Sequence, residues 1–156
     1  MTRTDEQRFL DRFTMIMSES GYPRMAARVF TAILLSEHGR RTAGELAEEL
    51  DAGPSAISGA VKYLIQVDML VRERAPDRRR DHYRVHESAW YGAIRSAREV
   101  FRRFEEGARE GVAVFGADTP VGARLEETRS FFAHLSDEVP ELLRKWREMP
   151  PPASAP

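Results

Sequence analysis

The sequence predicts a mainly α-helical fold that carries a small β-sheet of two or three strands. Apolar residues recur at spacings of three and four over most of the 156 residues, which is the period of an amphipathic helix. The alternation typical of strands occurs only in 69–75 and 82–86, on either side of the polar segment 76–81. With 42% hydrophobic and 31% charged residues, the composition is typical of a globular chain rather than of a disordered one.

The chain contains no cysteine, which excludes disulfide frameworks and thiolate metal sites. No apolar run approaches the roughly 18 residues that a membrane span requires. Residues 1–11 are charged and lack the apolar core of a secretory signal. We therefore expect a cytoplasmic protein without membrane contact.

Two helices are expected at the start of the chain, over 5–19 and 24–36. The first has Phe9 and Phe13 on one apolar face, and Gly21-Tyr22-Pro23 separates it from the second. Glycine commonly ends a helix and proline suits the beginning of the next one. A turn is expected over 38–41.

A pair of short helices should follow that turn. Thr42 and Glu45 have the spacing of a capping box, in which each side chain bonds the free backbone N–H of the other, so a helix is expected over 43–50. Gly53 and Pro54 suit the cap and the first position of a second helix that runs to about residue 66. A hairpin of the two strand-like segments comes next.

The last third of the chain should form two long helices, over 88–115 and about 120–146. Apolar residues repeat along both at alternating spacings of four and three, which is the seam of a coiled coil. Pro140 should kink the second helix or divide it. The segment 150–156 is rich in proline and is expected to be a disordered tail.

The order of helix, tight turn, helix and hairpin predicts a helix-turn-helix followed by a β wing. Residues 51–86 carry seven basic and five acidic side chains and form the one net-positive part of a chain whose net charge is −1. The outer face of the second helix is small enough to enter a major groove roughly 12 Å wide, and the wing tip carries an arginine triplet. The predicted DNA contacts are Thr42, Ser55, Ala56, Ser58, Gly59, Lys62, Tyr63, Arg78, Arg79 and Arg80.

Residues 24–86 resemble the winged-helix domain of the MarR family, and most of all its GbsR-like branch. The matching stretches are 42–47, 55–64 and the wing segment 76–83. The resemblance implies a dimer with recognition helices in successive major grooves and wing arginines in the minor groove. Asp77 and Asp68 depart from residues common at those positions, and Asp77 leaves open which arginine projects toward DNA.

With this resemblance, the chain divides into an N-terminal dimerisation helix (1–21), a winged helix-turn-helix domain (22–87), a C-terminal helical dimerisation region (88–149) and the tail. The helix over 88–115 would be about 40 Å long, and a domain of this size cannot cover its apolar seam. A second copy of the chain would cover it. The predicted interface residues are Phe9, Phe13, Ile94, Phe101, Phe104, Leu125, Phe132, Leu135 and Leu142.

The sequence therefore favours a homodimeric regulator, a repressor, that binds double-stranded DNA at a pseudo-palindrome. A small-molecule effector is a further expected partner, because the resemblance places effector pockets between the DNA-reading domain and the dimerisation helices. Tyr22, Trp90 and Tyr91 are the candidates for its border. The alternative is a winged-helix module that binds another protein and no DNA.

No enzyme, cofactor or metal site is expected. His82 and His86 on one strand would lie about 13 Å apart, too far to share an ion. The adjacent carboxylates at 105–106 and 126–127 would point apart on a helix and are expected to be solvated charges. No pattern of a nucleophile beside a base is present.

Overall fold

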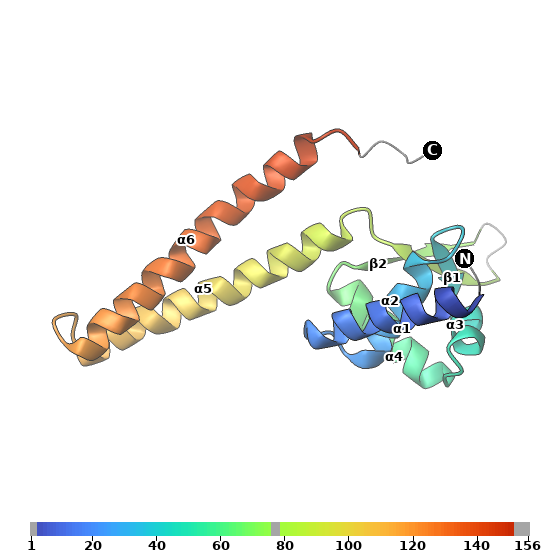
Figure 1. The fold of residues 1–156 in the computed structure, drawn as a ribbon, viewed down its shortest axis with the longest axis horizontal. Helices are drawn as coiled ribbons and strands as arrows, with labels where there is room; N and C mark the ends of the chain where they lie inside the picture. The colour runs from blue at the N-terminus through green and yellow to red at the C-terminus, as the bar shows by residue number, and fades with distance from the viewer. Residues whose placement is uncertain (1–2, 76–78, 152–156) are drawn as a thin grey trace. The chain divides into compact units, whose positions relative to one another are not determined.

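The computed structural model of the protein describes residues 3–75 and 79–151. The chain forms two compact units, 1–92 and 93–156 (Figure 1). Its elements, in order, are α1 (Arg3–Glu19), α2 (Arg24–Leu34), β1 (Arg40–Thr42), α3 (Ala43–Glu49), α4 (Pro54–Gln66), β2 (Leu70–Arg74), β3 (Asp81–Val85), α5 (Ala89–Phe115) and α6 (Pro120–Glu148). The predicted class, mainly α with a small sheet, is confirmed.

The sheet has three antiparallel strands in the order β1-β3-β2. Its third strand corrects the expected turn over 38–41, because Arg40 and Arg41 pair with β3 opposite Arg84 and Tyr83. A strand of three residues is too short to show the alternation of apolar and polar residues, and its partner strand lies some forty residues further along the chain. The sequence therefore gave no sign of it. The pairing places the start of α3 beside the wing.

The core of the first unit lies beneath α2, α3, α4 and the sheet. Its largest fully buried side chains include Phe30, Ile33, Leu46, Ile57 and Leu64. The helix α1 joins this core: Met17 is only 3% exposed, and Phe13 packs against the cluster. The first helix therefore contributes to the fold of the first unit.

Element boundaries differ from the sequence expectation by one or two residues. The helix α2 ends at Leu34, and the Ser36 hydroxyl, expected in its last turn, instead donates to the carbonyl of Ile33 at 2.6 Å. Such a side-chain bond competes with the helical hydrogen bonds and ends the helix. In the described ranges 3–75 and 79–151, no helix has the length and hydropathy of a membrane span.

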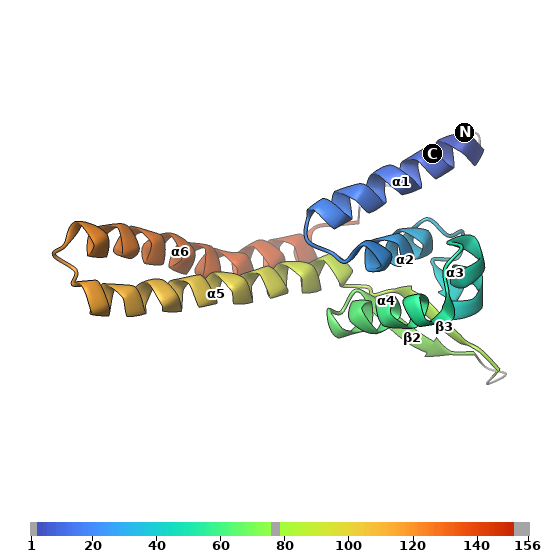
Figure 2. The same ribbon diagram turned by 90° about the horizontal axis from the view of Figure 1, so that it is seen from below.

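In the second unit, α5 and α6 form an antiparallel hairpin (Figure 2). Phe132 of α6 lies between Phe101 and Phe104 of α5, with ring centroids 5.9 and 4.7 Å away. The two helices come very close at Gly111, where an added Cβ would lie 2.7 Å from the Leu125 side chain. Part of the predicted apolar seam thus packs within the chain.

The turn between α5 and α6 depends on two glycines. Gly116 has φ +86°, in the left-handed region that favours glycine. A Cβ at Gly122 would lie 1.8 Å from the carbonyl oxygen of Gly116, so no larger residue fits there. The Thr119 hydroxyl caps α6 by accepting the N–H of Gly122 at 3.0 Å.

Pro140 lies inside α6 and does not divide it, since the helix is continuous from Pro120 to Glu148. Proline has no N–H, so the carbonyl four residues earlier, that of Ser136, loses its helical partner. Arg98 of α5 supplies the missing donor through its Nε at 2.9 Å. A side chain from the neighbouring helix thereby stabilises the position that proline weakens. Of the predicted tail 150–156, residues 152–156 lie outside the described part of the chain.

Candidate nucleic-acid interface

The helix α3 begins with the predicted capping box. The Thr42 hydroxyl accepts the N–H of Glu45 at 3.2 Å, and the Glu45 carboxylate accepts the N–H of Thr42 at 2.7 Å. That backbone donor holds the pKa of Glu45 below its ordinary value. Thr42 is 7% exposed. Its hydroxyl is engaged in the cap, and its predicted contact with DNA stays a prediction.

A tight turn connects α3 to α4. Asp51 takes the left-handed conformation, with φ 47°, and the next N–H, that of Ala52, donates to the carbonyl of Ala47 at 3.0 Å. This is the pattern of a glycine-type helix end occupied by aspartate, which tolerates the conformation better than most residues. Gly53 is then the N-cap of α4 and Pro54 its first residue, as the sequence predicted.

The helix α4 has a buried face and an exposed face. Ile57, Ala60, Val61 and Leu64 are buried against the core. The exposed residues near its start have small side chains, and a Cβ at Gly59 would meet nothing within 4 Å. The exposed set, expected from the sequence, is Ser55, Ala56, Ser58, Gly59 and Lys62. The helix thus presents to solvent a surface of small side chains and one lysine.

Tyr63 lies at the edge of the predicted outer face, and its predicted contact with DNA stays a prediction. It is half-buried and packs against the core cluster. Burial raises the pKa of Tyr22, and the nearby Tyr63 raises it further, so the two phenols lie close enough to interact. The helical period places residue 63 at the edge of the outer face, and packing with the preceding elements decides its environment.

The wing is the hairpin of β2 and β3, in which Leu70 pairs with Val85 and Arg74 with Asp81. Beyond the last pair, the N–H of Ala75 donates to the carbonyl of Arg80 at 3.3 Å. Arg79 and Arg80 are exposed at the end of the hairpin. Arg78, the first residue of the predicted arginine triplet, lies outside the described residues, as do Pro76 and Asp77.

Ion pairs order the wing below its tip. Arg84 of β3 bonds Glu73 of β2, and this bond raises the pKa of the guanidinium. Arg72 lies 3.7 Å from a carboxylate oxygen of Asp81 and over the Tyr83 ring, 5.7 Å from its centroid. Exposed ion pairs of this kind contribute little stability each. Both pairs join β2 to β3, so they tie together the two strands of the wing.

Between α3, α4 and the wing lies a groove of about 680 Å³. Ser58 and Lys62 line it from α4, and Arg72 and Tyr83 line it from the strands. Arg72 is a candidate that sequence reasoning missed. The strand alternation places Arg72 on the same face of β2 as buried Leu70. Its position in the groove with Lys62 depends on how the hairpin packs against α4.

The histidines and carboxylates set aside from the sequence have local partners. His86 Nδ1 accepts the N–H of Ser88 at 2.9 Å, just before α5 begins. His82 lies on β3 opposite Glu73. Among the residues described, no cluster of three or more histidine, aspartate or glutamate side chains could hold a metal ion.

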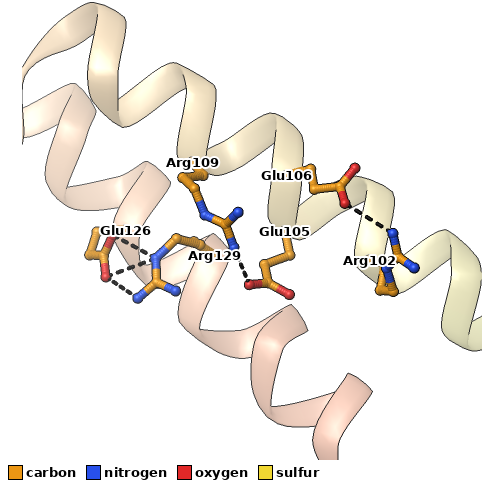
Figure 3. A network of polar contacts seen from close by, with 6 residues as sticks. All are labelled: Arg102, Glu105, Glu106, Arg109, Glu126 and Arg129. Carbon is orange, nitrogen blue, oxygen red and sulfur yellow. Dashed lines mark hydrogen bonds and ion pairs between the residues drawn. The ribbon is translucent and has the colours of Figure 1, made fainter.

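Three of the adjacent glutamates, Glu105, Glu106 and Glu126, form ion pairs with arginines on their own helices (Figure 3). Glu105 binds Arg109 at 2.7 Å, and Glu106 binds Arg102 at 3.1 Å. Glu126 binds Arg129 through three contacts of 2.5 to 3.1 Å, and this contact lowers the pKa of the carboxyl. These groups are surface ion pairs, as expected of solvated charges on helices.

The candidate effector residues belong to the first unit. Trp90 is 49% exposed and meets Phe30 edge to face, with ring centroids 5.4 Å apart. Tyr22 and Tyr91 are half-buried. The pocket predicted beside these three residues stays a prediction.

The predicted dimer residues divide by exposure. Phe9, Ile94, Phe104 and Leu142 are large apolar side chains that remain 40–62% exposed in the single chain. The other five are partly buried within it: Phe13, Phe101, Leu125, Phe132 and Leu135.

A helix-turn-helix followed by an antiparallel hairpin, and joined to long helices on either side, defines a winged helix-turn-helix protein. The sequence comparisons agree. The model of the MarR family matches residues 20–81, and the model of the MmpR5-like MarR family transcriptional regulators matches residues 88–149. Together these two matches take in most of the chain.

A relative and a solved structure extend the match. The HTH-type transcriptional regulator MmpR5 of Mycobacterium tuberculosis is 23% identical over 145 residues, which are 92% of this chain and 88% of that protein. A crystal structure described as a transcriptional regulator has the same fold, with a TM-score of 0.77 and 23% identity over 93% of this chain and 99% of that one. The chain is thus similar to MarR-family transcriptional regulators over 20–81 and 88–149, and it has the winged helix-turn-helix fold.

Proposed function

We propose that the protein is a homodimeric repressor that binds a pseudo-palindromic operator. Each α4 would enter a major groove, and the wing arginines would reach the adjacent minor groove. The two recognition helices would then lie about 34 Å apart, one turn of DNA. Residues 22–87 would read the DNA, and α1, α5 and α6 would hold the two copies together.

The observation that carries this proposal is the exposed face at the start of α4. Ser55, Ser58 and Gly59 leave the helix backbone free to approach a groove floor closely, and the N–H groups of the first turn favour a phosphate. Lys62 one turn later, and Arg79 and Arg80 on the wing, provide cations on the same unit. With no arginine, asparagine or glutamine at the start of this face, we expect modest base discrimination aided by DNA shape.

Exposed apolar surface on α5 and α6 supports the dimer. Beyond the predicted Phe104 and Leu142, the side chains of Val114, Phe131 and Trp146 are each more than half exposed. A two-helix hairpin has little room for a core of its own, and exposed apolar faces of this extent mark interaction surfaces. An isologous contact between two copies would cover them.

Three finer expectations remain proposals. The GbsR-like branch rests on the sequence motifs, whereas the model that matches 88–149 is that of MmpR5-like regulators. An effector pocket bordered by Tyr22, Trp90 and Tyr91 and a cytoplasmic location rest on the resemblance and on the composition. No catalytic role, metal or cofactor is proposed.

The wing provides the test of the function. Replacing Arg79 and Arg80 by alanine should weaken binding to every duplex and reduce the salt dependence of the affinity by about two phosphate contacts. The matched control replaces Arg8 and Arg12, two exposed arginines of α1, and should leave the salt dependence unchanged. Unchanged affinity in the wing variant would contradict the wing assignment and would favour the protein-binding module.

A further inference from the structure

The groove between α3, α4 and the wing is lined by two cations from different elements. Lys62 belongs to α4, and Arg72 belongs to β2. Apolar side chains of α4 also line the groove, among them Ile57, Val61 and Ile65. None of the described residues that line it is acidic. The charge of the groove therefore suits an anionic partner, and its apolar part suits a partner that also carries C–H groups.

On the α4 side, the groups open to a partner are those of Ser58 and Lys62. The two residues are four apart, so they lie one turn apart on the same face of the helix, and both are exposed. In residues 3–75 and 79–151, Lys62 forms no ion pair. An ammonium group carries three N–H donors, and those of Lys62 are available to a partner in the groove.

On the wing side, Arg72 is held by two neighbours on β3. Its Nε lies 3.7 Å from a carboxylate oxygen of Asp81, and its guanidinium carbon lies 5.7 Å from the centroid of the Tyr83 ring. Tyr83 is only 8% exposed, so its ring is a fixed support. The Arg72 side chain is still 56% exposed. Because Asp81 faces the Nε side of the guanidinium, most of its five N–H donors remain for another acceptor.

The register of the wing directs Arg72 toward the helices. Arg72 and buried Leu70 are two residues apart on β2, so they share one face of the sheet. Arg72 is also paired with Tyr83, which belongs to the core cluster. The strand β2 contacts α4, and the hairpin runs alongside this helix (Figure 2). The guanidinium therefore stands in the space between α4 and the wing.

The shape of DNA defines what would occupy this space. In B-DNA, a sugar–phosphate strand separates each major groove from the adjacent minor groove. A protein that places a helix in the major groove and a wing in the adjacent minor groove has to straddle that strand. In the proposed complex, α4 and the wing are those two parts, and the groove lies between them.

We propose that the groove holds this strand of the DNA backbone, and that Arg72 and Lys62 bind its phosphates from the two sides. The inference rests on the proposed DNA-binding function and adds Arg72 to the residues that contact DNA. Guanidinium groups bind phosphates through parallel N–H donors. The deoxyribose C–H groups would contact the apolar side chains of the groove. Contacts of this kind fix the position of the protein on the duplex and do not read the sequence.

Asp81 and Tyr83 act through Arg72 and are positioning residues. They hold its guanidinium in the groove before DNA arrives, so less side-chain freedom is lost on binding. The ion pair is exposed, and such pairs contribute little to the stability of a fold. Removing the charge of Arg72 should therefore change DNA binding and leave the melting temperature of the protein nearly unchanged.

The experiment measures the affinity of the full chain for a labelled random-sequence duplex at several salt concentrations by fluorescence anisotropy. Arg72→Gln removes the charge and keeps most of the side chain. It should bind about tenfold more weakly, since it loses a hydrogen bond between charged groups. The slope of log affinity against log salt should become shallower by about 0.9, the value for one phosphate. Lys62→Gln should have the same effect on the slope.

The matched control is Arg40→Gln. Arg40 is exposed and pairs with Arg84, the neighbour of Tyr83 on β3, so it lies on the other face of the same sheet. The control removes the same charge and should leave the salt slope as in the wild type. An equal change of slope in Arg40→Gln and Arg72→Gln would overturn the assignment, because it would reflect net charge and not a contact in the groove.

Two failures can be told apart. A wild type without salt-dependent affinity for any duplex would overturn the proposed function, and the groove assignment with it. If the wild type binds with a salt slope that the Arg79 and Arg80 alanine variant reduces, an unchanged slope in Arg72→Gln would overturn the groove assignment alone. Lys62→Gln decides the matter if Arg72→Gln does not fold, because Lys62 has no ion pair in the described residues to lose. An unchanged slope there would overturn the assignment as well.

Discussion

Gly59 allows the recognition face to be tested without weakening the fold. It lies on the exposed side of α4, and a Cβ added there meets no atom within 4 Å. Glycine inside a helix is about 0.8–1.0 kcal/mol less favourable than alanine, and leucine is nearly as favourable as alanine. Gly59→Ala and Gly59→Leu should therefore both stabilise the free protein by about 0.5–1 kcal/mol.

For a unit of this size, that gain corresponds to a rise of roughly 2–8 °C in melting temperature. DNA binding should change in the opposite direction. A leucine side chain at residue 59 would stand between the helix backbone and the groove floor, so Gly59→Leu should lose at least tenfold in affinity, or about 1.4 kcal/mol. Alanine adds one methyl group and should lose much less.

The assay is a fluorescence-anisotropy titration of a labelled duplex at fixed salt, together with thermal unfolding of the same preparations. Gly59→Ala serves as the control, because it shares the gain in helix propensity but adds little bulk. A Gly59→Leu variant that is stabilised and binds DNA as tightly as the wild type would refute the placement of this face in the groove.

Three further predictions concern the helix-turn-helix and the hairpin. Thr42→Ala removes the hydroxyl that caps α3 and should lower the free energy of unfolding by about 1 kcal/mol, measured by urea denaturation. The pKa of Glu45 is lowered in the folded state, so its negative charge stabilises the fold at pH values above its ordinary pKa of 4.5. The wild type should therefore have a larger free energy of unfolding than Glu45→Gln at pH 6. This difference should disappear as the pH falls through the lowered pKa of the folded state. A pH-independent difference would contradict this. Gly122→Ala places a methyl group against the carbonyl of Gly116 and should cost about 3 kcal/mol or more in the same urea assay; an unchanged unfolding midpoint would argue against the tight turn.

Much of the fold could be predicted because local signals and long-range packing agree. The Thr42–Glu45 capping box and the glycine and proline at 53 and 54 place α3 and α4 to within a residue. The buried side of α4 followed from its helical period. Asp68, noted as a departure from glycine, indeed has a positive φ, of 59°.

What could not be predicted depends on contacts between distant segments. The strand β1 forms only because β3 pairs with it, and its three polar residues do not by themselves predict a strand. Tyr63 packs against the core cluster, a contact that the helical period alone does not decide. A heptad pattern looks the same in the sequence whether the partner helix belongs to the same chain or to a second copy. The sequence therefore could not show that Phe132 packs against α5 of its own chain.

The central claim is that two copies of α4 read DNA as a pair, and selection from a random duplex pool at near-physiological salt tests it most directly. Several rounds with the purified protein should recover a pseudo-palindrome whose half-sites lie about 10 bp apart, centre to centre. Affinity for the recovered duplex should fall with increasing salt. Failure to enrich any sequence, together with no salt-dependent affinity for any duplex, would contradict the account.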